Sequence, residues 1–507
     1  MNRPPDVLFI NFDSATVSYQ ELAVDFAAIE PPTWSLLLAQ SCRSKGFGAA
    51  ILDASAERLT LVQAVVRISE IKPRLACFVV YGQNPNSGTT NMTGNTGCAL
   101  LLKESHPEIP VCFVGSHTSA LPLEVLALPY VDFVLLNEGL YALLNLLKTD
   151  LQTGLGTVRG IGFKQDGRPV LNSPERVVPQ DKMDVDLPGY AWDLLPFRER
   201  PLDLYRAHFW HAEFSHAKRT PFAAIYTSLG CKFKCNFCMI NIVNRVDNTE
   251  GTTSAMSPNM RFWSPGFILN ELDRLAALGV ETIRLSDEMF FLNKNYYEPL
   301  VTGLAEHGLN LRMWAYSRVD TVRPKYLEMF QKAGINWLAL GIEAGSQTVR
   351  QEVSKGSFKD VNIREVVKAT RASGMNVISN YIFGFPDDTP ETMRQTLDLA
   401  LELCTEMVNM YPCQALPGSP LYYEARAKGW LLPETYAGYA FLSYESQPLP
   451  TKHLSARDVL RFRDDSWHTY FSHLPFLSIV ETKFGLQARR NVEDLAKIRL
   501  RRQLLVA

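Results

Sequence analysis

The first 150 residues alternate between short apolar runs and longer segments with helical periodicity. The runs are continuous, rich in Val, Ile and Phe, and bounded by turn residues, as strands buried on both faces are. They cover residues 7–12, 49–52, 75–81, 111–115 and 131–136. The segments between them, residues 32–45, 61–71, 93–105, 122–126 and 140–148, can each hold a crossover helix or a short substitute. The pattern predicts a doubly wound, five-stranded α/β domain over residues 1–150.

Residues 151–215 differ in character from the segments on either side. Turn signals occur at 166–167 and 172–174, and an acidic, proline-containing stretch follows at 181–196. We interpret this segment as a linker that contains one hairpin.

From Thr220 onward, a helical stretch that ends at a glycine is repeatedly followed by an apolar strand. Gly279, Gly308, Gly334 and Gly374 stand at these junctions, where glycine suits the left-handed residue after a helix. The clearest helix covers 265–278, with Ser264 as N-cap and Pro265 in its first turn. Strands are expected at 222–228, 282–286, 311–317, 337–342, 377–383 and 407–411. The repeat predicts a partial (β/α)6 barrel over residues 216–430, followed by a small, mostly helical domain over 431–507 that helps to cap it.

Composition places the chain among ordinary folded proteins. Of its 507 residues, 46% are hydrophobic and 21% charged, and 51 Lys and Arg against 53 Asp and Glu give a formal charge of -2. This balance provides no general attraction to nucleic acid. Neither a basic, apolar leader nor a run of about 18 apolar residues occurs, so we expect a cytoplasmic protein without a transmembrane segment.

Three of the nine cysteines form the motif Cys231-Lys232-Phe233-Lys234-Cys235-Asn236-Phe237-Cys238, directly after the first strand of the predicted barrel. Thiolates spaced CxxxCxxC on one loop can bind three corners of an iron-sulfur cluster and leave the fourth free. A structural zinc site would need a fourth protein ligand, and the nearest histidine is His216, before the loop. The motif therefore favours a cluster with one open corner.

The motif, its aromatic Phe237 and its place in a partial barrel resemble the radical S-adenosylmethionine (SAM) enzymes. The resemblance implies a 4Fe-4S cluster whose free iron binds SAM, an external electron donor such as flavodoxin or ferredoxin, and cleavage of SAM to a 5′-deoxyadenosyl radical. It also implies SAM contacts at the strand ends. Beside Phe237, the candidates are Asp287, Glu288, Ser317, Arg318, Glu343 and Gly384.

The order of a Rossmann-like domain, a linker and this barrel is similar to the cobalamin-binding radical SAM family. The resemblance implies that the corrinoid tail lies against the loops after the third to fifth strands. These loops, 81–90, 115–119 and 137–139, contain Ser87, Thr89, Gly115, Ser116, His117, Glu138 and Gly139 as candidate cobalamin contacts. The DxHxxG motif that supplies a cobalt ligand elsewhere is absent after the first strand, where Asn11-Phe12-Asp13-Ser14-Ala15-Thr16 stands. We expect no histidine ligand to cobalt from that loop; His117 remains a candidate to hold the loop, the nucleotide or cobalt.

The other cysteines leave two interpretations open. Cys42, Cys77, Cys98 and Cys112 could bind a second cluster, as in methylthiotransferases, but Cys42, Cys77 and Cys112 lie in apolar strand or helix patterns, which favours buried core thiols. Tyr411 and Cys413 follow the last barrel strand and are candidate substrate contacts, with ordinary packing as the alternative.

The resemblance implies a cobalamin-dependent radical SAM methyltransferase that acts on an unactivated carbon or phosphorus of a small metabolite. Two alternatives remain. The same cofactors could serve a cyclisation or rearrangement without net methylation, or the chain could be a corrinoid or iron-sulfur carrier.

Overall fold

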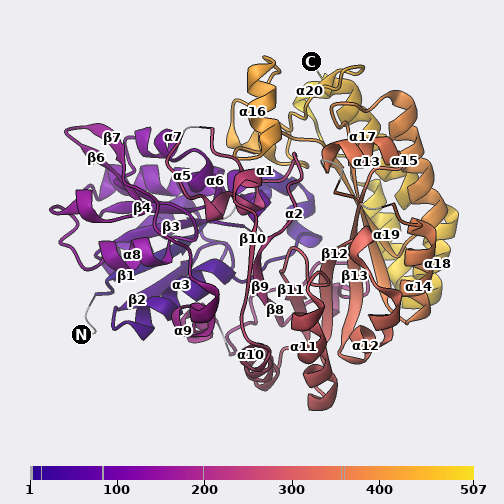
Figure 1. The fold of residues 1–507 in the computed structure, drawn as a ribbon, viewed down its shortest axis with the longest axis horizontal. Helices are drawn as coiled ribbons and strands as arrows, with labels where there is room; N and C mark the ends of the chain where they lie inside the picture. The colour runs from indigo at the N-terminus through magenta and orange to yellow at the C-terminus, as the bar shows by residue number, and fades with distance from the viewer. Residues whose placement is uncertain are drawn as a thin grey trace.

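The computed structural model describes residues 4–12, 14–82, 85–197, 199–249, 251–354, 357–358 and 360–506. Asp13, Gln83 and Asn84, which belong to loops considered above, lie outside these residues. Two α/β halves stand side by side, with the N-terminal half at the left of Figure 1 and the barrel strands at the right. The antiparallel pair β9 (Ser228–Cys231) and β10 (Asn259–Phe262) lies between them.

The N-terminal sheet has seven strands in the order β2-β1-β3-β4-β5-β6-β7. The five predicted strands are confirmed as a parallel set: β1 (Val7–Asn11), β2 (Ala49–Asp53), β3 (Ala76–Val80), β4 (Val111–Gly115) and β5 (Phe133–Leu135). The predicted number of five is too small. The linker hairpin, β6 (Ile161–Gln165) and β7 (Arg168–Leu171), pairs antiparallel with β5 and extends the sheet.

Helices cover both faces of this sheet, as a doubly wound fold requires. Phe9 and Cys77 face α3 (Thr33–Ser44) and α8 (Leu140–Leu146), whereas Ile10 and Phe78 face α4 (Leu61–Ile71), α5 (Gly88–Ser105) and α7 (Pro122–Ala127). Cys42, Cys98 and Cys112 are buried in these two cores with Cys77. The four thiols therefore pack as core residues.

Two segments predicted as loops are helical. α5 begins at Gly88, five residues before the predicted start, and α6 (Ser116–Ala120) directly follows β4. Both segments are rich in small residues and lack an apolar stripe, so hydrophobic periodicity does not indicate a helix there. The loops at the carboxyl ends of the strands are accordingly short.

The second sheet contains the six predicted barrel strands, all parallel, in the order β15-β14-β13-β12-β11-β8. They are β8 (Phe222–Ile225), β11 (Thr282–Leu285), β12 (Arg312–Arg318), β13 (Ile335–Glu343), β14 (Asn376–Phe383) and β15 (Met407–Pro412). Intervening helices are α10 (Pro265–Ala277), α11 (Lys294–His307), α12 (Leu327–Lys332), α13 (Gln347–Val353), α14 (Ile363–Ala372) and α15 (Pro390–Leu403). The sheet is an open half-barrel.

Local signals in the sequence explain these elements. The Ser264 hydroxyl accepts a hydrogen bond from the Phe267 amide (3.2 Å), and α10 buries Ile268, Leu272 and Leu275. The four junction glycines, 279, 308, 334 and 374, all have positive φ angles, between 63° and 91°. Each helix is thus stopped where the sequence predicts.

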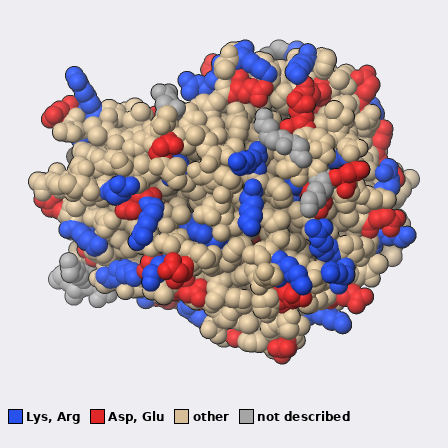
Figure 2. Space-filling model, viewed as in Figure 1, with Lys and Arg blue, Asp and Glu red and all other residues tan. Residues whose placement is uncertain are grey.

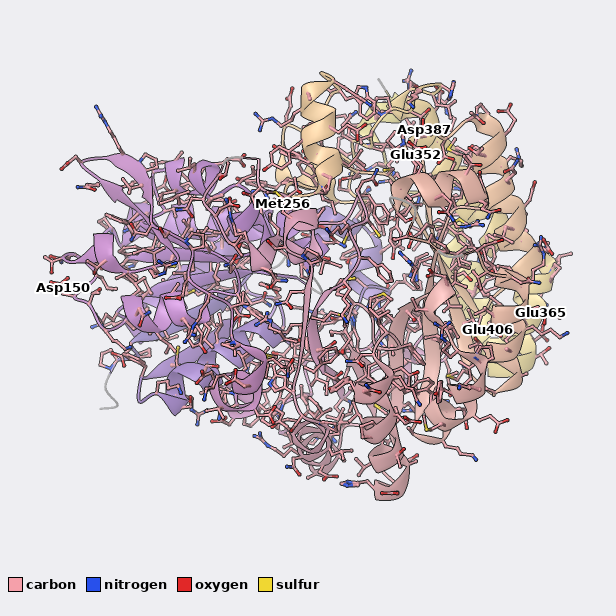
Figure 3. The ribbon with its side chains drawn as sticks, in the orientation of Figure 1. Asp150, Met256, Glu352, Glu365, Asp387 and Glu406 are labelled. Carbon is pink, nitrogen blue, oxygen red and sulfur yellow. The ribbon has the colours of Figure 1, made fainter. Side chains whose placement is uncertain are left out.

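The C-terminal helices continue the outer layer of the half-barrel. They are α16 (Pro420–Ala427), α17 (Ala456–Phe471), α18 (Leu474–Phe484), α19 (Leu486–Lys497) and α20 (Gln503–Val506). Arg463 on α17 donates to the Met410 carbonyl of edge strand β15 (2.6 Å), and buried Glu406, labelled in Figure 3, accepts from Arg371 and from Lys483 on α18. Through these contacts α17 and α18 cover the edge strand β15, and Val459 of α17 also packs against Gly384 in the turn after β14.

The molecular surface carries mixed charge. Figure 2 shows basic and acidic side chains interspersed over one face. Among the described residues, no helix has the length and apolar character needed to cross a bilayer. The exact domain boundaries stay predictions.

Gly139 offers a test of how tightly the carboxyl edge of the first sheet is packed. Its φ is +78°, and a Cβ there would lie 2.5 Å from Val114 Cγ2. Gly154 has a similar φ of +69° with nothing within 4 Å of a built Cβ. Gly139→Ala should therefore lower the free energy of unfolding by about 1–3 kcal/mol more than Gly154→Ala, because only the former adds a steric clash. Equal losses in urea denaturation would contradict this packing.

Candidate active site

The CxxxCxxC loop begins at the end of β9. Gly230, just before it, has a φ of +84°, and a Cβ there would lie 2.2 Å from the Asn259 carbonyl oxygen of β10. Only glycine fits this approach. Cys231 is buried, whereas Cys235 and Cys238 are partly exposed. The loop thus leaves from β9, one strand after the first half-barrel strand β8, and this close approach fixes its backbone there.

Hydrogen bonds hold the loop from within the barrel half. Asn241 accepts from the Cys231 amide (3.0 Å) and donates to the Cys231 carbonyl (2.8 Å). The Phe233 amide donates to Cys231 Sγ (3.4 Å), and donation to a cluster sulfur is one of the means by which proteins tune such a centre. Among the described residues, no three His, Cys, Asp or Glu side chains are arranged around a single metal ion. A cluster differs from such a site because each thiolate binds a different iron.

The carboxyl edge of the N-terminal sheet holds the other end of the loop. Asn86, in the single turn η1 (Pro85–Ser87), accepts from the Met239 amide (3.0 Å) through Oδ1. Buried Arg245 donates to the Ser119 carbonyl (2.7 Å), and Asn137 donates to the Arg245 carbonyl (2.9 Å). The two halves therefore meet at the cysteine loop.

A buried ion pair completes this junction. Arg261 on β10 donates to Glu138 Oε2 (2.8 Å), and the two side chains are 5% and 3% exposed. Glu138 also accepts from the Val178 amide, and its carbonyl accepts from Trp34. Glu138 thus faces Arg261, so its predicted contact with cobalamin would have to be made alongside this pair.

Two carboxylates among the predicted SAM contacts flank the cysteines. Glu288 follows β11, and its buried Oε1 has no hydrogen-bond partner among the described residues. Glu343 ends β13 with a φ of +67°. Burial raises the pKa of Glu288 to about 8 and that of Glu343 to about 7. Burial, with Glu343 nearby, also raises the pKa of the Cys235 thiol to about 11. A positive charge beside either carboxylate would oppose this effect of burial and favour its ionised form.

Phe237 and Gly384 are brought together through Phe385. The rings of Phe237 and Phe385 lie 5.4 Å apart, which joins the cysteine loop to the turn after β14. Asp388 accepts from the Gly384 and Phe385 amides (both 3.0 Å) and fixes that turn. A Cβ at Gly384 would lie 2.3 Å from Val459 Cγ1 on α17, so the C-terminal helices support the turn.

The other predicted SAM contacts have internal partners. Asp287 accepts from the Thr227 amide (2.6 Å) and from the hydroxyls of Thr227 and Ser228, while burial raises its pKa to about 6. The fork of Arg318 binds Asp320 (2.6 and 2.8 Å) and stacks on Phe233, 3.6 Å from the ring centroid. Ser317 and Thr321 share a hydrogen bond of 2.7 Å. Asp287 therefore holds the turn between β8 and β9, and Arg318 packs on Phe233 of the cysteine loop.

The predicted cobalamin contacts lie close together at the carboxyl edge of the first sheet. The Ser116 hydroxyl donates to the Pro85 carbonyl (2.5 Å), and Thr89 Oγ1 lies 3.1 Å from His117 Nδ1. A Cβ at Gly115 would lie 2.4 Å from the Val80 carbonyl, and Ser87 packs against Gly82. Buried polar atoms without a hydrogen-bond partner in the described chain also gather here: His117 Nε2, Thr118 Oγ1 and Asn137 Oδ1.

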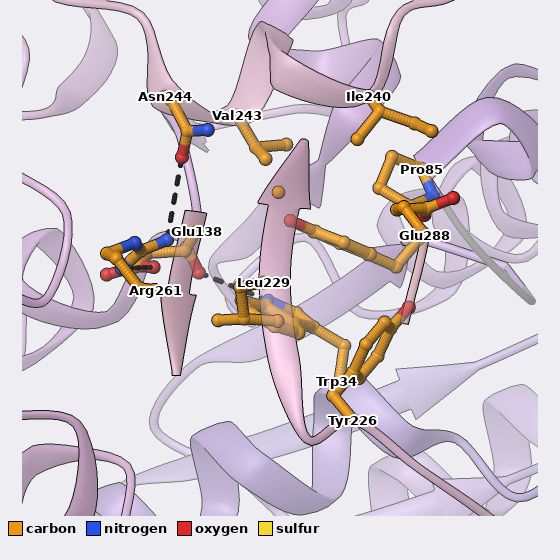
Figure 4. A pocket seen from close by; sticks show the side chains of 12 residues that line it. Trp34, Pro85, Glu138, Tyr226, Leu229, Ile240, Val243, Asn244, Arg261 and Glu288 are labelled. Atoms are coloured by element: carbon orange, nitrogen blue, oxygen red, sulfur yellow. Dashed lines mark hydrogen bonds and ion pairs between the residues drawn. The ribbon is translucent and has the colours of Figure 1, made fainter. Parts of the chain in front are cut away.

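A small cavity of about 20 Å³, room for roughly one water molecule, lies between the halves (Figure 4). The N-terminal half contributes Trp34, Tyr81, Pro85 and Glu138 to its lining. The barrel half contributes Tyr226, Leu229, Gly230, Ile240, Val243, Asn244, Arg261 and Glu288. The two halves are therefore closely packed against each other at this point.

Sequence reasoning missed a buried ion pair inside the half-barrel. Arg284 on β11, 1% exposed, donates to both carboxylate oxygens of Glu30 (2.8 and 2.7 Å). His208 Nε2 lies 2.9 Å from Glu30 Oε1, and Arg284 also bonds to the Tyr316 hydroxyl (3.3 Å). Glu30 and Arg284 are 254 residues apart in the chain, and no motif links them.

The two candidate substrate contacts differ in placement. Tyr411 is half-buried and occupies a strand register shared with Ile382 of β14, with its ring 4.9 Å from that of Phe441. Cys413 is buried in a small apolar cluster, and its carbonyl accepts from the Leu449 amide (3.0 Å). The packing interpretation thus suits Cys413 better than Tyr411.

Comparisons with known proteins agree with this geometry. Residues 225–400 match the Radical SAM superfamily. The chain is 24% identical over 448 residues to an uncharacterized methyltransferase of Pyrococcus horikoshii, covering 87% of this chain and 88% of that protein. It is also 24% identical over 436 residues to an anaerobic magnesium-protoporphyrin IX monomethyl ester cyclase of Rubrivivax gelatinosus, covering 82% and 69%.

Among solved structures, the fold resembles the radical S-adenosylmethionine methyltransferase TsrM of Kitasatospora setae. The structure with tryptophan and a SAM analogue gives a TM-score of 0.66 at 15% identity, over 97% of this chain and 99% of that one. A second TsrM structure, with cobalamin and a [4Fe-4S] cluster, gives 0.62 at 16% identity, over 83% and 74%. The likeness extends across both halves.

The Glu30–Arg284 pair generates a pH-dependent prediction. Burial raises the pKa of Glu30, but Arg284 and His208 outweigh it and hold that pKa below its ordinary value. The pair thus stabilises the fold above the ordinary carboxyl pKa, and this contribution is lost as pH falls through the lowered pKa. Glu30→Gln should lower the free energy of unfolding at pH 7 by about 3–5 kcal/mol, because Arg284 is left buried without a counter-charge.

The difference between Glu30→Gln and the natural protein should shrink as the pH falls below about 4.5, in urea titrations at several pH values. Asp193→Asn, which breaks an exposed pair with Arg43, serves as the control and should cost at most about 1 kcal/mol. An effect of Glu30→Gln that is equally small, or constant with pH, would contradict this interpretation.

Proposed function

We propose that the chain, whose residues 225–400 match the radical SAM superfamily, is a cobalamin-dependent methyltransferase acting on an unactivated carbon or phosphorus of a small metabolite. The main support is the cysteine loop, which follows the first strand of a half-barrel and is bonded to the carboxyl edge of a doubly wound sheet. That edge is where ligands bind in such sheets.

Cys231, Cys235 and Cys238 are the proposed ligands of a 4Fe-4S cluster. The donor set fits, because three thiols share one loop and the surrounding contacts fix its backbone. Glu288 and Glu343 are the proposed contacts of the cationic part of SAM, and the Phe237–Phe385 pair with the Gly384 turn forms the proposed adenine wall. When bound, the cluster supplies the reductive cleavage of SAM, and cobalamin supplies delivery of the methyl group.

The carboxyl edge of the first sheet is the proposed cobalamin site. Its support is the pair of buried atoms without a hydrogen-bond partner in the described chain, Thr118 Oγ1 and Asn137 Oδ1, because buried polar atoms ordinarily have partners. Ser87, Thr89 and Ser116 supply hydroxyls beside them, and the cavity lined by Trp34 and Glu288 joins this edge to the barrel. The protein's share of the reaction is to hold these groups together and to exclude water.

A cyclisation or rearrangement without net methylation is the second candidate. The similarity to a cyclase over 82% of the chain supports it. Product mass distinguishes the two, because methyl transfer adds a CH2 unit. An iron-sulfur or corrinoid carrier is the third, and reductive cleavage of SAM by the purified protein would exclude it. We further propose a cytoplasmic location, with flavodoxin or ferredoxin as electron donor.

The cluster assignment predicts the effect of single cysteine substitutions. Cys231→Ala, Cys235→Ala or Cys238→Ala should each abolish 5′-deoxyadenosine production from SAM, because the loop has no spare ligand. Cys98→Ala, in the core of the first domain, should retain activity and about four iron atoms per chain, the content of one 4Fe-4S centre. Normal activity in any loop variant would overturn the assignment, and about eight irons would favour a second cluster.

The cobalamin assignment predicts the spectrum of the Co(II) form. Electron paramagnetic resonance of the anaerobically loaded protein should show no splitting from a nitrogen ligand, because His117 is buried between Thr89, Glu124 and Tyr436. His117→Gln should leave the spectrum unchanged. Nitrogen splitting that disappears in His117→Gln would make His117 the cobalt ligand, and failure to bind any corrinoid would overturn the cobalamin proposal.

A further inference from the structure

Asn86 belongs to the N-terminal half and contacts a cysteine of the barrel half. Its side-chain amide Nδ2 lies 3.8 Å from Cys238 Sγ, within hydrogen-bonding range for sulfur. Its Oδ1 accepts from the Met239 amide at 3.0 Å. The residue is half-buried, 152 positions before Cys238, and outside the cysteine motif.

The Met239 contact fixes which end of the Asn86 amide faces the sulfur. A backbone N–H can only donate, so the group that accepts it is the amide oxygen. The NH2 group is then the end directed at Cys238 Sγ. The structure also allows the thiol to donate to Oδ1 (3.9 Å), but a metal-bound thiolate has no proton to give. With a cluster in place, the N–H to sulfur bond alone remains.

The turn that carries Asn86 is firmly placed. The Pro85 carbonyl accepts from the Ser116 hydroxyl, and the Ser87 carbonyl accepts from Thr90 (2.8 Å). Ser116 itself is fully buried after β4. Asn86 is thus anchored to the sheet of one half while its amide reaches the loop of the other.

We propose that Asn86 is a positioning residue that tunes the iron-sulfur centre by donating a hydrogen bond from the N-terminal half to the Cys238 thiolate. This inference rests on the proposed 4Fe-4S cluster. Hydrogen bonds to cluster sulfurs raise the reduction potential, because they stabilise the extra negative charge of the reduced form. Cys231 receives its N–H bond from Phe233 of its own loop, whereas Cys238 receives it from the other half.

Two variants distinguish an effect of Asn86 on the reduction potential of the cluster from a purely structural role in holding the loop. Asn86→Asp retains an acceptor for the Met239 amide but loses the donor and adds a negative charge. Asn86→Ala loses both contacts. Asn91→Ala, on the first turn of α5, is the matched control, because it removes the same kind of side-chain amide close by. In the part of the chain that the structure describes, the Asn91 side chain has no hydrogen bond to a cysteine.

The experiment is a redox titration of each reconstituted protein, followed by the electron paramagnetic resonance signal of the reduced cluster, with iron measured in parallel. Both Asn86 variants should hold about four irons, while at a fixed potential their ratio of reduced to oxidised cluster falls about tenfold, equal to 59 mV for one electron. An exchangeable proton coupled to the cluster should disappear in both, and Asn91→Ala should match the natural protein.

The outcomes separate this inference from the proposed function. An unchanged potential and proton coupling in Asn86→Asp at full iron content would overturn the tuning role, as would loss of iron from both Asn86 variants, which would make Asn86 a support of the loop. Absence of a cluster from the natural protein would instead overturn the proposed function.

Discussion

The buried ion pair between Glu138 and Arg261 is the interaction on which the geometry of the site depends. It joins the carboxyl edge of the N-terminal sheet to β10, and β10 pairs with β9, from which the cysteine loop starts. Each partner has a second contact at Val178, through its amide and its carbonyl, so desolvation of the charges is offset on both sides. Pairs of this kind contribute little net stability but penalise any other arrangement strongly. The relative placement of the halves is therefore specific.

The contacts around this pair give the cysteine loop two sources of rigidity. Asn241 and Phe233 hold Cys231 from within the barrel half, and Asn86 holds the segment at Cys238 from the other half. Glu288 and Trp34 face the same cavity from opposite sides. The space between them has room for about one water molecule, so residues of both halves pack closely beside the loop.

Much of the fold could be predicted from local patterns. All six barrel strands, their glycine-terminated helices and the Ser264 cap follow from periodicity and capping chemistry, which act over a few residues. The turn signals predict a hairpin within residues 151–215. They do not predict that this hairpin pairs with β5, because the pairing of an edge strand depends on which segments lie nearby in space.

The site was predictable in outline only. The three cysteines and the carboxylates at strand ends have positional signals, whereas the Glu30–Arg284 and Asn86–Cys238 contacts join residues 254 and 152 positions apart. Arg318 binds Asp320 two residues away, whereas Asp287 binds Thr227 60 residues away, and a charged residue in a sequence does not reveal whether its charge serves a ligand or the protein itself. Here Thr227 and Asp320 already occupy those groups.

The order of the contacts along the chain has a consequence for biogenesis. Asn86, Ser119, Asn137 and Glu138 all precede the cysteine loop, and their partners at and after it, Met239, Arg245 and Arg261, come 108 to 153 residues later. Domains fold as units from the N-terminus during synthesis. The residues of the N-terminal half that hold the loop are thus folded while the ribosome is still making the loop. The thiols therefore emerge beside contacts that restrain them before iron is delivered.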